Sequence, residues 1–218
     1  MPLTALINGK VLCSVDFTDE EWEHLKKDYK AGRVSIILPP DNSPGYLRKS
    51  KLGTKHFVHL KKDHFEPESD EHLKIKEIIY KTCKRKSLVV ETEHMEKDWI
   101  ADVYCFIPGK RIVFEVQLSN LPVHSLLERQ RRYEQSHITA VWLLKDIPFD
   151  LNFFMHVPSI RIEKDNNKYY VYIKQNMKME LSSFVEKFLS GKIIPAKPKG
   201  IYIWEIEENA FENTSIFE

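Results

Sequence analysis

The chain has 218 residues, of which 42% are hydrophobic and 30% are charged. This balance is typical of a globular protein that can bury a full core and needs no disulfide or metal ion in order to fold. The 33 lysines and arginines against 32 aspartates and glutamates leave a net charge of +1, which excludes an overall basic character as a sign of nucleic-acid binding.

The apolar runs and the cysteines indicate in which cellular compartment the protein is expected. The longest apolar runs have five residues, whereas a membrane-spanning helix needs about 20. The N-terminus has neither a basic segment nor a long apolar one, so we expect no secretory signal. The three cysteines lie far apart without a Cys-x-x-Cys pair, which excludes a disulfide scaffold and a four-cysteine zinc site. We therefore expect a cytoplasmic protein that does not engage a membrane.

Residues 1–66 are expected to form an N-terminal β/α section. The dipeptide Asn8-Gly9 lies between apolar flanks and predicts a β-hairpin. Thr18 followed three residues later by Glu21 predicts a capping box at the start of a helix. The other elements predicted here are the end of that helix at Gly32, a strand at 34–38 and a turn-rich loop at 39–45.

Charge is unevenly distributed along the chain. Residues 46–62 hold six lysines and arginines and no acid, and residues 74–86 hold six against one glutamate. Residues 205–218 hold five glutamates and no base. The chain could therefore present a basic groove beside an acidic tail. A solvated surface on which charges cluster by chance explains the same pattern, and both interpretations stay open.

Residues 67–146 are expected to form the core of the protein. The apolar spacing predicts the order helix, strand, strand, strand, helix, strand. These elements are a helix after Ser69, strands at 88–95, 99–106 and 111–117, a helix at 122–135 and a strand at 138–144. The Pro108-Gly109 turn predicts an antiparallel hairpin, and the strands on either side of the second helix are expected to be parallel neighbours. The expected fold class is mixed α/β.

Residues 147–218 are expected to support this core within one compact unit. The predicted elements are a hairpin at 159–174, a short amphipathic helix that stops at Gly191 and a strand at 201–206. The last strand and the acidic tail suggest a docking edge, for a larger protein partner or a second copy of the chain.

Two acids lie in strands that otherwise consist of apolar residues. Asp102 is in the strand before the Pro108-Gly109 turn and Glu115 is in the strand after it. Burying a carboxylate is costly unless it is paired or binds a metal. We expect the two acids to hold Mg²⁺ or Mn²⁺ together with the carbonyl of Val116, because these hard ions prefer oxygen. Gln117 projects from the same strand face as Glu115 and could orient a water molecule.

These residues resemble a known family of proteins. An acid on one strand, Glu-x-Lys on the next, and then a helix and a parallel strand form the pattern of the PD-(D/E)xK nucleases. The chain resembles more closely the competence-protein CoiA family, which has Glu-x-Gln at this place. The matching pieces are His56-Phe57-Val58-His59, Glu68 to His72 with Lys76, Ala101-Asp102-Val103, Glu115 to Ser119, Arg129 with Tyr133, and Val141 to Leu144.

The resemblance implies a restriction-endonuclease-like core and a Mg²⁺- or Mn²⁺-dependent deoxyribonuclease. In the superfamily an acid from the helix before the hairpin often joins the site. Glu68, Glu71 and His72 are the candidates here, and His72 could also take a proton from the attacking water. The same residues would arise at an ordinary helix start, because acids in the first turn favour the helix dipole. Which of the three completes the site is left open.

Basic side chains are the expected contacts to nucleic acid. Arg129 and Tyr133 are one helical turn apart and would face the site or a phosphate. Four lysines from the two basic runs would contact the DNA backbone, namely Lys49, Lys51, Lys55 and Lys76. The partner is therefore expected to be DNA, with its strandedness undetermined.

Two functions follow from the sequence. The first is a metal-dependent DNA nuclease that serves DNA uptake, recombination, or mobile-element or phage defence. The alternative is a catalytically inactive module of the same fold that binds nucleic acid or a protein partner. The amide of Gln117 cannot accept the proton of an attacking water, and this keeps the alternative open.

Overall fold

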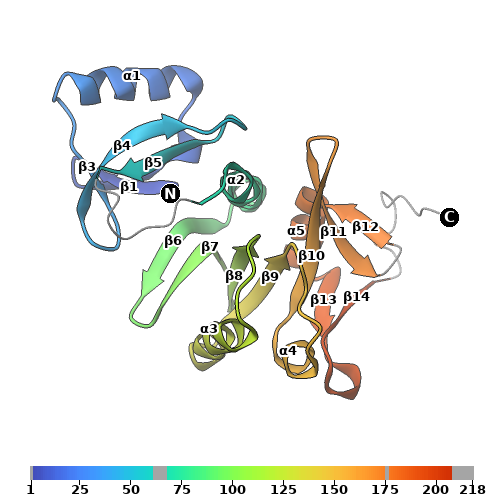
Figure 1. Cartoon of the computed structure of the whole chain (residues 1–218). Coiled ribbons are helices and arrows are strands. Elements are labelled where there is room, and N and C mark those ends of the chain that lie inside the picture. The colour runs from blue at the N-terminus through green and yellow to red at the C-terminus, as the bar shows by residue number, and fades with distance from the viewer. Residues whose placement is uncertain (1, 61–67, 175–176, 208–218) are drawn as a thin grey trace. The chain divides into compact units, whose positions relative to one another are not determined.

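The computed structural model describes residues 2–60, 68–174 and 177–207 (Figure 1). The chain divides into two compact units. The first unit comprises Met1–Lys81 and Val90–Tyr104, and the second comprises Thr82–Val89 and Cys105–Glu218. The division into three sections at residues 66 and 146 rests on sequence pattern and stays a prediction.

The first unit begins with the predicted hairpin and helix. Strands β1 (Thr4–Ile7) and β2 (Lys10–Cys13) are antiparallel, and Asn8 and Gly9 both have positive φ, as a tight two-residue turn requires. Helix α1 (Asp19–Lys30) starts with the predicted capping box. The amide of Glu21 donates to the Thr18 hydroxyl, and the amide of Thr18 donates to the Glu21 carboxylate.

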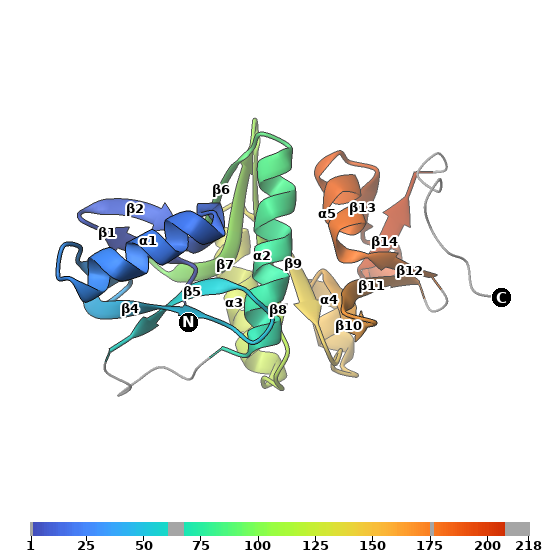
Figure 2. The same ribbon diagram turned by 90° about the horizontal axis from the view of Figure 1, so that it is seen from above.

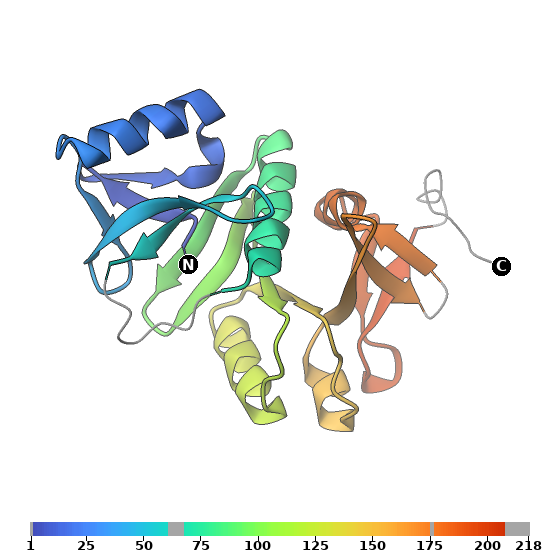
Figure 3. The same cartoon turned by 45° about the horizontal axis from the view of Figure 1, so that its top comes forward.

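A five-stranded sheet with the order β2-β1-β3-β4-β5 organises this part of the first unit. Its further strands are β3 (Ile36–Leu38), β4 (Ser43–Lys49) and β5 (Lys55–His59). Helix α1 covers one face of the sheet (Figures 2 and 3). Its buried residues Trp22 and Leu25 belong to one apolar cluster with Ile7, Leu38 and Phe57 of the strands.

Strand β4 corrects the predicted loop at 39–45. The strand begins at Ser43, inside the stretch that its turn-forming residues assigned to a loop. Gly45 explains the difference, because a Cβ atom at this position would lie 2.6 Å from the Leu38 side chain. Gly45 therefore serves close packing within the sheet here rather than a turn.

The rest of the first unit carries the helix and strands that precede the Pro108-Gly109 turn. Helix α2 (Asp70–Arg85) is followed by β6 (Val89–Glu96) and β7 (Trp99–Ile107). Ala101 and Val103 are fully buried in β7, whereas Asp102 between them is half-buried. The alternation of a strand thus separates Asp102 from its apolar neighbours.

The second unit contains the predicted parallel pair. Strand β8 (Lys110–Gln117) lies parallel to β9 (Thr139–Leu144), with α3 (Val123–Gln135) between them in the chain. Glu115 is opposite Trp142 in this register. The predicted succession of helix, three strands, helix and strand is confirmed, and the fold class is mixed α/β.

The C-terminal elements extend the sheet of the second unit in the order β12-β11-β10-β9-β8. They are α4 (Leu151–His156), β10 (Ser159–Asp165), β11 (Lys168–Lys174), β12 (Met177–Glu180), α5 (Leu181–Leu189), β13 (Ile193–Ala196) and β14 (Ile203–Ile206). Helices α3 and α4 lie side by side (Figure 3). Helix α4 is not among the predicted elements. It begins at the N-cap Asp150, whose carboxylate accepts from the Phe153 amide.

The two faces of β8 meet different helices. The Phe114 ring packs against Phe188 of α5, whereas the Glu115 carboxylate meets Tyr133 of α3. Successive residues of a strand point to opposite faces, so these helices cover opposite sides of the strand. Within the described ranges no helix is long and apolar enough to cross a membrane. Most of the acidic tail, residues 208–218, lies outside the described residues.

Candidate metal centre and a second carboxylate network

The start of α2 positions two of the candidate site residues. The amide of His72 donates to the Ser69 hydroxyl at 3.1 Å, so Ser69 caps the helix as the sequence predicted. His72 falls in the first turn, and Glu68 lies just before the helix. His72 and Lys76 are four residues apart on one side of α2, and the Lys76 ammonium pairs with the Glu68 carboxylate.

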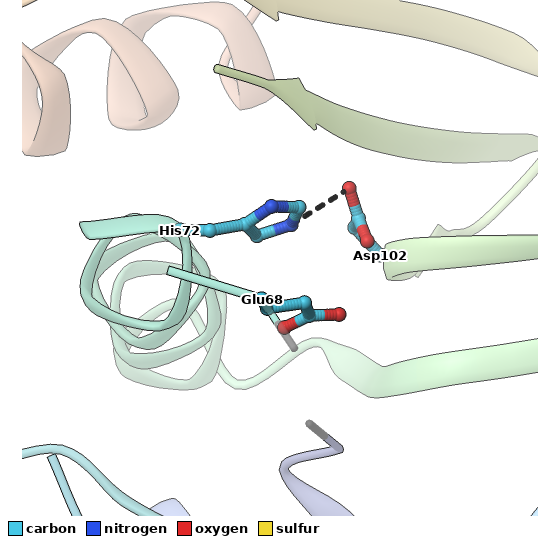
Figure 4. Close-up of side chains that lie close together, drawn as sticks. All are labelled: Glu68, His72 and Asp102. Atoms are coloured by element: carbon cyan, nitrogen blue, oxygen red, sulfur yellow. Dashed lines mark ion pairs between the residues drawn. The ribbon is translucent and has the colours of Figure 1, made fainter. Parts of the chain in front are cut away.

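Asp102 of β7 meets this side of the helix within the first unit. The His72 Nε2 atom lies 3.3 Å from Asp102 Oδ2, and the Glu68 carboxylate lies beside the pair (Figure 4). One ligand atom from each of the three residues lies within 4.8 Å of the others. Two carboxylates and one imidazole at this spacing form a donor set that can hold a cation.

The charges around His72 determine its pKa. Burial alone would lower the pKa of the imidazole, but the neighbouring Asp102 carboxylate, assisted by Glu68, outweighs that effect and raises it. Both His72 and Asp102 have side chains that are 18% exposed. The cluster therefore attracts positive charge.

Lys76 lies at the inner side of the same cluster. Its Nζ atom is 3.2 Å from each carboxylate oxygen of Glu68 and 3.8 Å from Asp102 Oδ1. It is also 2.5 Å from Oε1 of Glu93, a residue of β6. The Lys76 side chain is fully buried. Burial would lower its pKa, but the surrounding carboxylates raise the pKa above the usual lysine value, so the amine is charged.

Glu115 forms a separate network in the second unit. Its side chain is 1% exposed, its Oε1 atom accepts from the Tyr133 hydroxyl, and its Oε2 atom accepts from Arg129 Nη2. The Arg129 guanidinium also lies 5.1 Å from the centre of the Trp142 ring. A buried carboxylate is thus matched by one cation and one hydroxyl donor.

Comparison with known proteins identifies the segment that carries both networks. Residues 68–152 match the family described as competence protein CoiA, nuclease-like domain. Over this segment the chain is similar to the CoiA nuclease-like family. No curated protein matches the chain, and no solved structure does. The cluster around His72 and the network around Glu115 both lie inside the matched segment.

Gln117 and Val116 complete the candidates from β8 of the CoiA nuclease-like domain. The Gln117 amide donates to the Ser119 carbonyl at 2.6 Å and to the Ser119 hydroxyl at 2.9 Å. It lines a pocket of the second unit at the carboxyl ends of β8 and β9, beside Asn120 and Asp146. Val116 is buried and lies opposite Leu143. The water-positioning role of Gln117 and the ligand role of the Val116 carbonyl stay predictions.

The lysines that were expected to contact DNA have different environments. Lys49 and Lys51 are exposed, although Lys49 Nζ lies 3.4 Å from Asp19. Lys55 has a side chain that is 13% exposed, and its Nζ donates to the Phe17 carbonyl and pairs with Asp19. Lys76 faces carboxylates inside the first unit, where a phosphate cannot reach it. The structure therefore places Lys76 in a role other than the predicted DNA contact.

Two further acids, Glu71 and Glu93, differ in how the sequence and the structure place them. Glu71 lies in the first turn of α2 but is not a member of the group formed by Glu68, His72 and Asp102. Sequence reasoning missed Glu93, which binds Lys76 from β6. The available signal was an acid within a predicted strand, the same signal that singled out Asp102 and Glu115.

Proposed function

We propose that the chain is a metal-dependent nuclease that hydrolyses phosphodiester bonds of DNA. The supporting observation is that Glu68, His72 and Asp102 bring their donor atoms within 4.8 Å of one another inside a nuclease-like domain. These three residues would hold a divalent cation. Such an ion, when bound, lowers the pKa of a coordinated water and offsets the negative charge of a phosphate.

The residues present fit such an ion. The His72 Nε2 atom is buried. It lies 3.3 Å from Asp102 Oδ2, but the two atoms are not oriented as a hydrogen bond. A cation between these groups would use the lone pair of the neutral imidazole. Carboxylates suit both Mg²⁺ and Mn²⁺, whereas an imidazole ligand suits transition metals. Of the two ions that the sequence predicts, the donor set favours Mn²⁺.

Two basic side chains would each contact a phosphate of the substrate, Arg129 of the second unit and Lys51 of the first. Arg129 is 35% exposed, so N–H groups of its guanidinium can contact a phosphate while Nη2 stays on Glu115. The exposed Lys51 would add a backbone contact. Glu115 and the Val116 carbonyl remain the ligands that the sequence alone proposes beside Asp102, and a metal titration separates the two ligand sets.

A cleavage assay tests the proposal. Labelled single-stranded, duplex and branched DNA are incubated with the purified chain and Mn²⁺ or Mg²⁺. We expect cleavage of at least one substrate, faster with Mn²⁺ than with Mg²⁺, and none in the presence of a chelator. An absence of cleavage across the whole panel with either ion would contradict a nuclease function.

The salt dependence of DNA binding tests the role of the basic run. Replacing Lys51 with Gln should reduce the slope of log affinity against log salt by about 0.9 on duplex DNA, because one phosphate contact is lost. Lys55→Gln is the matched comparison, since its ammonium is held by Asp19 and the Phe17 carbonyl. Equal slopes for wild type and Lys51→Gln would exclude Lys51 from the DNA contact.

A catalytically inactive nucleic-acid-binding module is the second candidate function. The observation that favours it is the Glu115 network, in which both carboxylate oxygens already accept hydrogen bonds from Tyr133 and Arg129. A structural role for Glu115 accounts for this arrangement. DNA binding that persists in a chelator, combined with no cleavage in any metal, would support this candidate.

A further inference from the structure

Lys76 is the most completely buried charged side chain in the candidate metal centre, with 0% of its side chain exposed. An ammonium group in the protein interior is costly unless carboxylates compensate it. It lies on α2 one turn after His72, and its ammonium is in contact with two of the proposed metal ligands, Glu68 and Asp102.

Three carboxylates surround the Lys76 amine, and they come from three parts of the first unit. Glu93 Oε1 lies at 2.5 Å, both oxygens of Glu68 lie at 3.2 Å, and Asp102 Oδ1 lies at 3.8 Å. Glu68 and Asp102 are also members of the proposed ligand group. Lys76 and a bound metal would therefore share two carboxylates.

Glu93 connects the Lys76 ammonium to the backbone at the start of the chain. Its second oxygen, Oε2, accepts from the amides of Leu3 at 3.1 Å and Thr4 at 3.0 Å. Glu93 has φ +51, a left-handed conformation that non-glycine residues adopt at a cost. The contacts with the Leu3 and Thr4 amides and with Lys76 hold the residue in this conformation. Glu93 is not one of the three ligand residues, so its charge acts on the cluster through Lys76.

Three carboxylates, those of Glu68, Glu93 and Asp102, surround this buried ammonium, and two of them are proposed metal ligands. We propose that Lys76 is a built-in counter-cation of the metal centre: it keeps the three carboxylates together without metal and shares two of them with a bound divalent ion. This inference rests on the proposed metal site but not on catalysis.

If Lys76 is the counter-cation, removing its charge should lower the stability of the metal-free protein and raise the affinity for the metal. Without the ammonium, three carboxylates repel one another in the metal-free protein, and the cluster attracts a cation more strongly. An ion that binds only the folded state raises the melting temperature by an amount that grows with its affinity. A lysine that served packing alone would lower stability equally with and without metal.

The experiment measures the melting temperature of the full chain with a chelator and with saturating Mn²⁺, and the Mn²⁺ affinity by calorimetry. The variant Lys76→Met keeps the length of the side chain and removes its charge. We expect one Mn²⁺ per wild-type chain, at least tenfold tighter Mn²⁺ binding by Lys76→Met, and a larger Mn²⁺-induced rise in its melting temperature. Lys74→Met is the matched control, because Lys74 lies on the same helix and pairs with Glu77. It should behave as wild type.

A second variant keeps the inference testable if Lys76→Met does not fold in the chelator. In that case Mn²⁺ should restore its folding. The variant Glu93→Gln retains an oxygen for the Leu3 and Thr4 amides but removes one negative charge. We expect it to bind Mn²⁺ about tenfold more weakly than wild type.

The outcomes separate this inference from the proposed function. Wild-type binding of one Mn²⁺, with the same affinity and thermal shift in Lys76→Met, would overturn the counter-cation role and leave the metal site intact. Failure of Lys76→Met to fold even with Mn²⁺, together with unchanged affinity in Glu93→Gln, would overturn it as well. A wild-type chain that binds no Mn²⁺ would overturn both the metal site and the inference.

Discussion

The two carboxylate clusters of the nuclease-like domain differ in charge balance. In the second unit, Glu115 is matched by one guanidinium, Arg129, and one hydroxyl, Tyr133. In the first unit, three carboxylates face the single ammonium of Lys76. In each cluster a neighbouring helix supplies a cation, and in the first cluster three carboxylates lie around that cation instead of one.

This difference supports the first cluster as the proposed ion site. A balanced pair such as Glu115 and Arg129 is satisfied without metal, and removing one partner leaves a buried charge unpaired and destabilises the fold. A surplus of carboxylates beside a buried imidazole is stabilised further by a divalent cation. Changes to the first cluster should therefore affect metal binding and activity, and changes to the second should affect stability.

The largest effect is expected from the first cluster. Asp102→Asn should lower the rate of Mn²⁺-dependent DNA cleavage at least 100-fold, because an amide is a much poorer ligand than a carboxylate. Single-turnover cleavage of a labelled oligonucleotide measures the change. The control is Asp98→Asn, at an exposed position of the preceding turn. A rate for Asp102→Asn within threefold of wild type would remove Asp102 from the site.

The second cluster should respond in stability. Glu115→Gln should lower the free energy of unfolding by about 2 kcal/mol, because the charge that Arg129 and Tyr133 bind is lost in a buried position. Urea denaturation measures this, with Glu128→Gln as the control on the exposed face of α3. Glu128 is 61% exposed and pairs with Arg132, so its loss should cost less than about 0.5 kcal/mol. Equal costs for the two variants would contradict the account of Glu115.

The hydroxyl of Tyr133 should contribute less than the Glu115 charge. Tyr133→Phe keeps the ring and removes the donor to Glu115 Oε1, so we expect a loss of about 1 kcal/mol in the free energy of unfolding. The same denaturation assay detects it. In a Glu115→Gln background the loss should be smaller, because the two groups form one network. Strict additivity of the two changes would show that they act independently.

The smallest effect concerns the pH dependence of the metal-free protein. The pKa of His72 is raised in the folded state above its ordinary value of 6.5, so protonated His72 stabilises the fold. This contribution is complete below about pH 6.5 and is lost as the pH rises through the raised value. The difference in unfolding free energy between wild type and His72→Gln in a chelator should therefore shrink with rising pH. A difference that grows with pH would contradict the raised pKa.

Local rules predicted much of the fold. The Asn8-Gly9 turn, the Thr18 capping box and the parallel pair of β8 and β9 depend on neighbouring residues or on a single crossover. The start of β4 was missed because Gly45 also occurs in turns. Its packing against Leu38 is a contact that no local pattern shows.

The site was less predictable because its charges come from distant segments. Four-residue spacing put Arg129 and Tyr133 on one face of α3, but it could not show that both bind Glu115. These two contacts make the Glu115 charge part of the packing between β8 and α3, which the spacing alone does not show. Lys76 was assigned to DNA because its run is basic.

A Mn²⁺ titration by calorimetry tests the central claim most directly, that the surplus of carboxylates in the first unit marks the cation site. The proteins compared are wild type, His72→Gln and Glu115→Gln. The account predicts one Mn²⁺ per wild-type chain, affinity reduced at least tenfold in His72→Gln, and affinity close to that of wild type in Glu115→Gln. Unchanged affinity in His72→Gln, with binding lost in Glu115→Gln, would contradict it and support the ligand set predicted from the sequence.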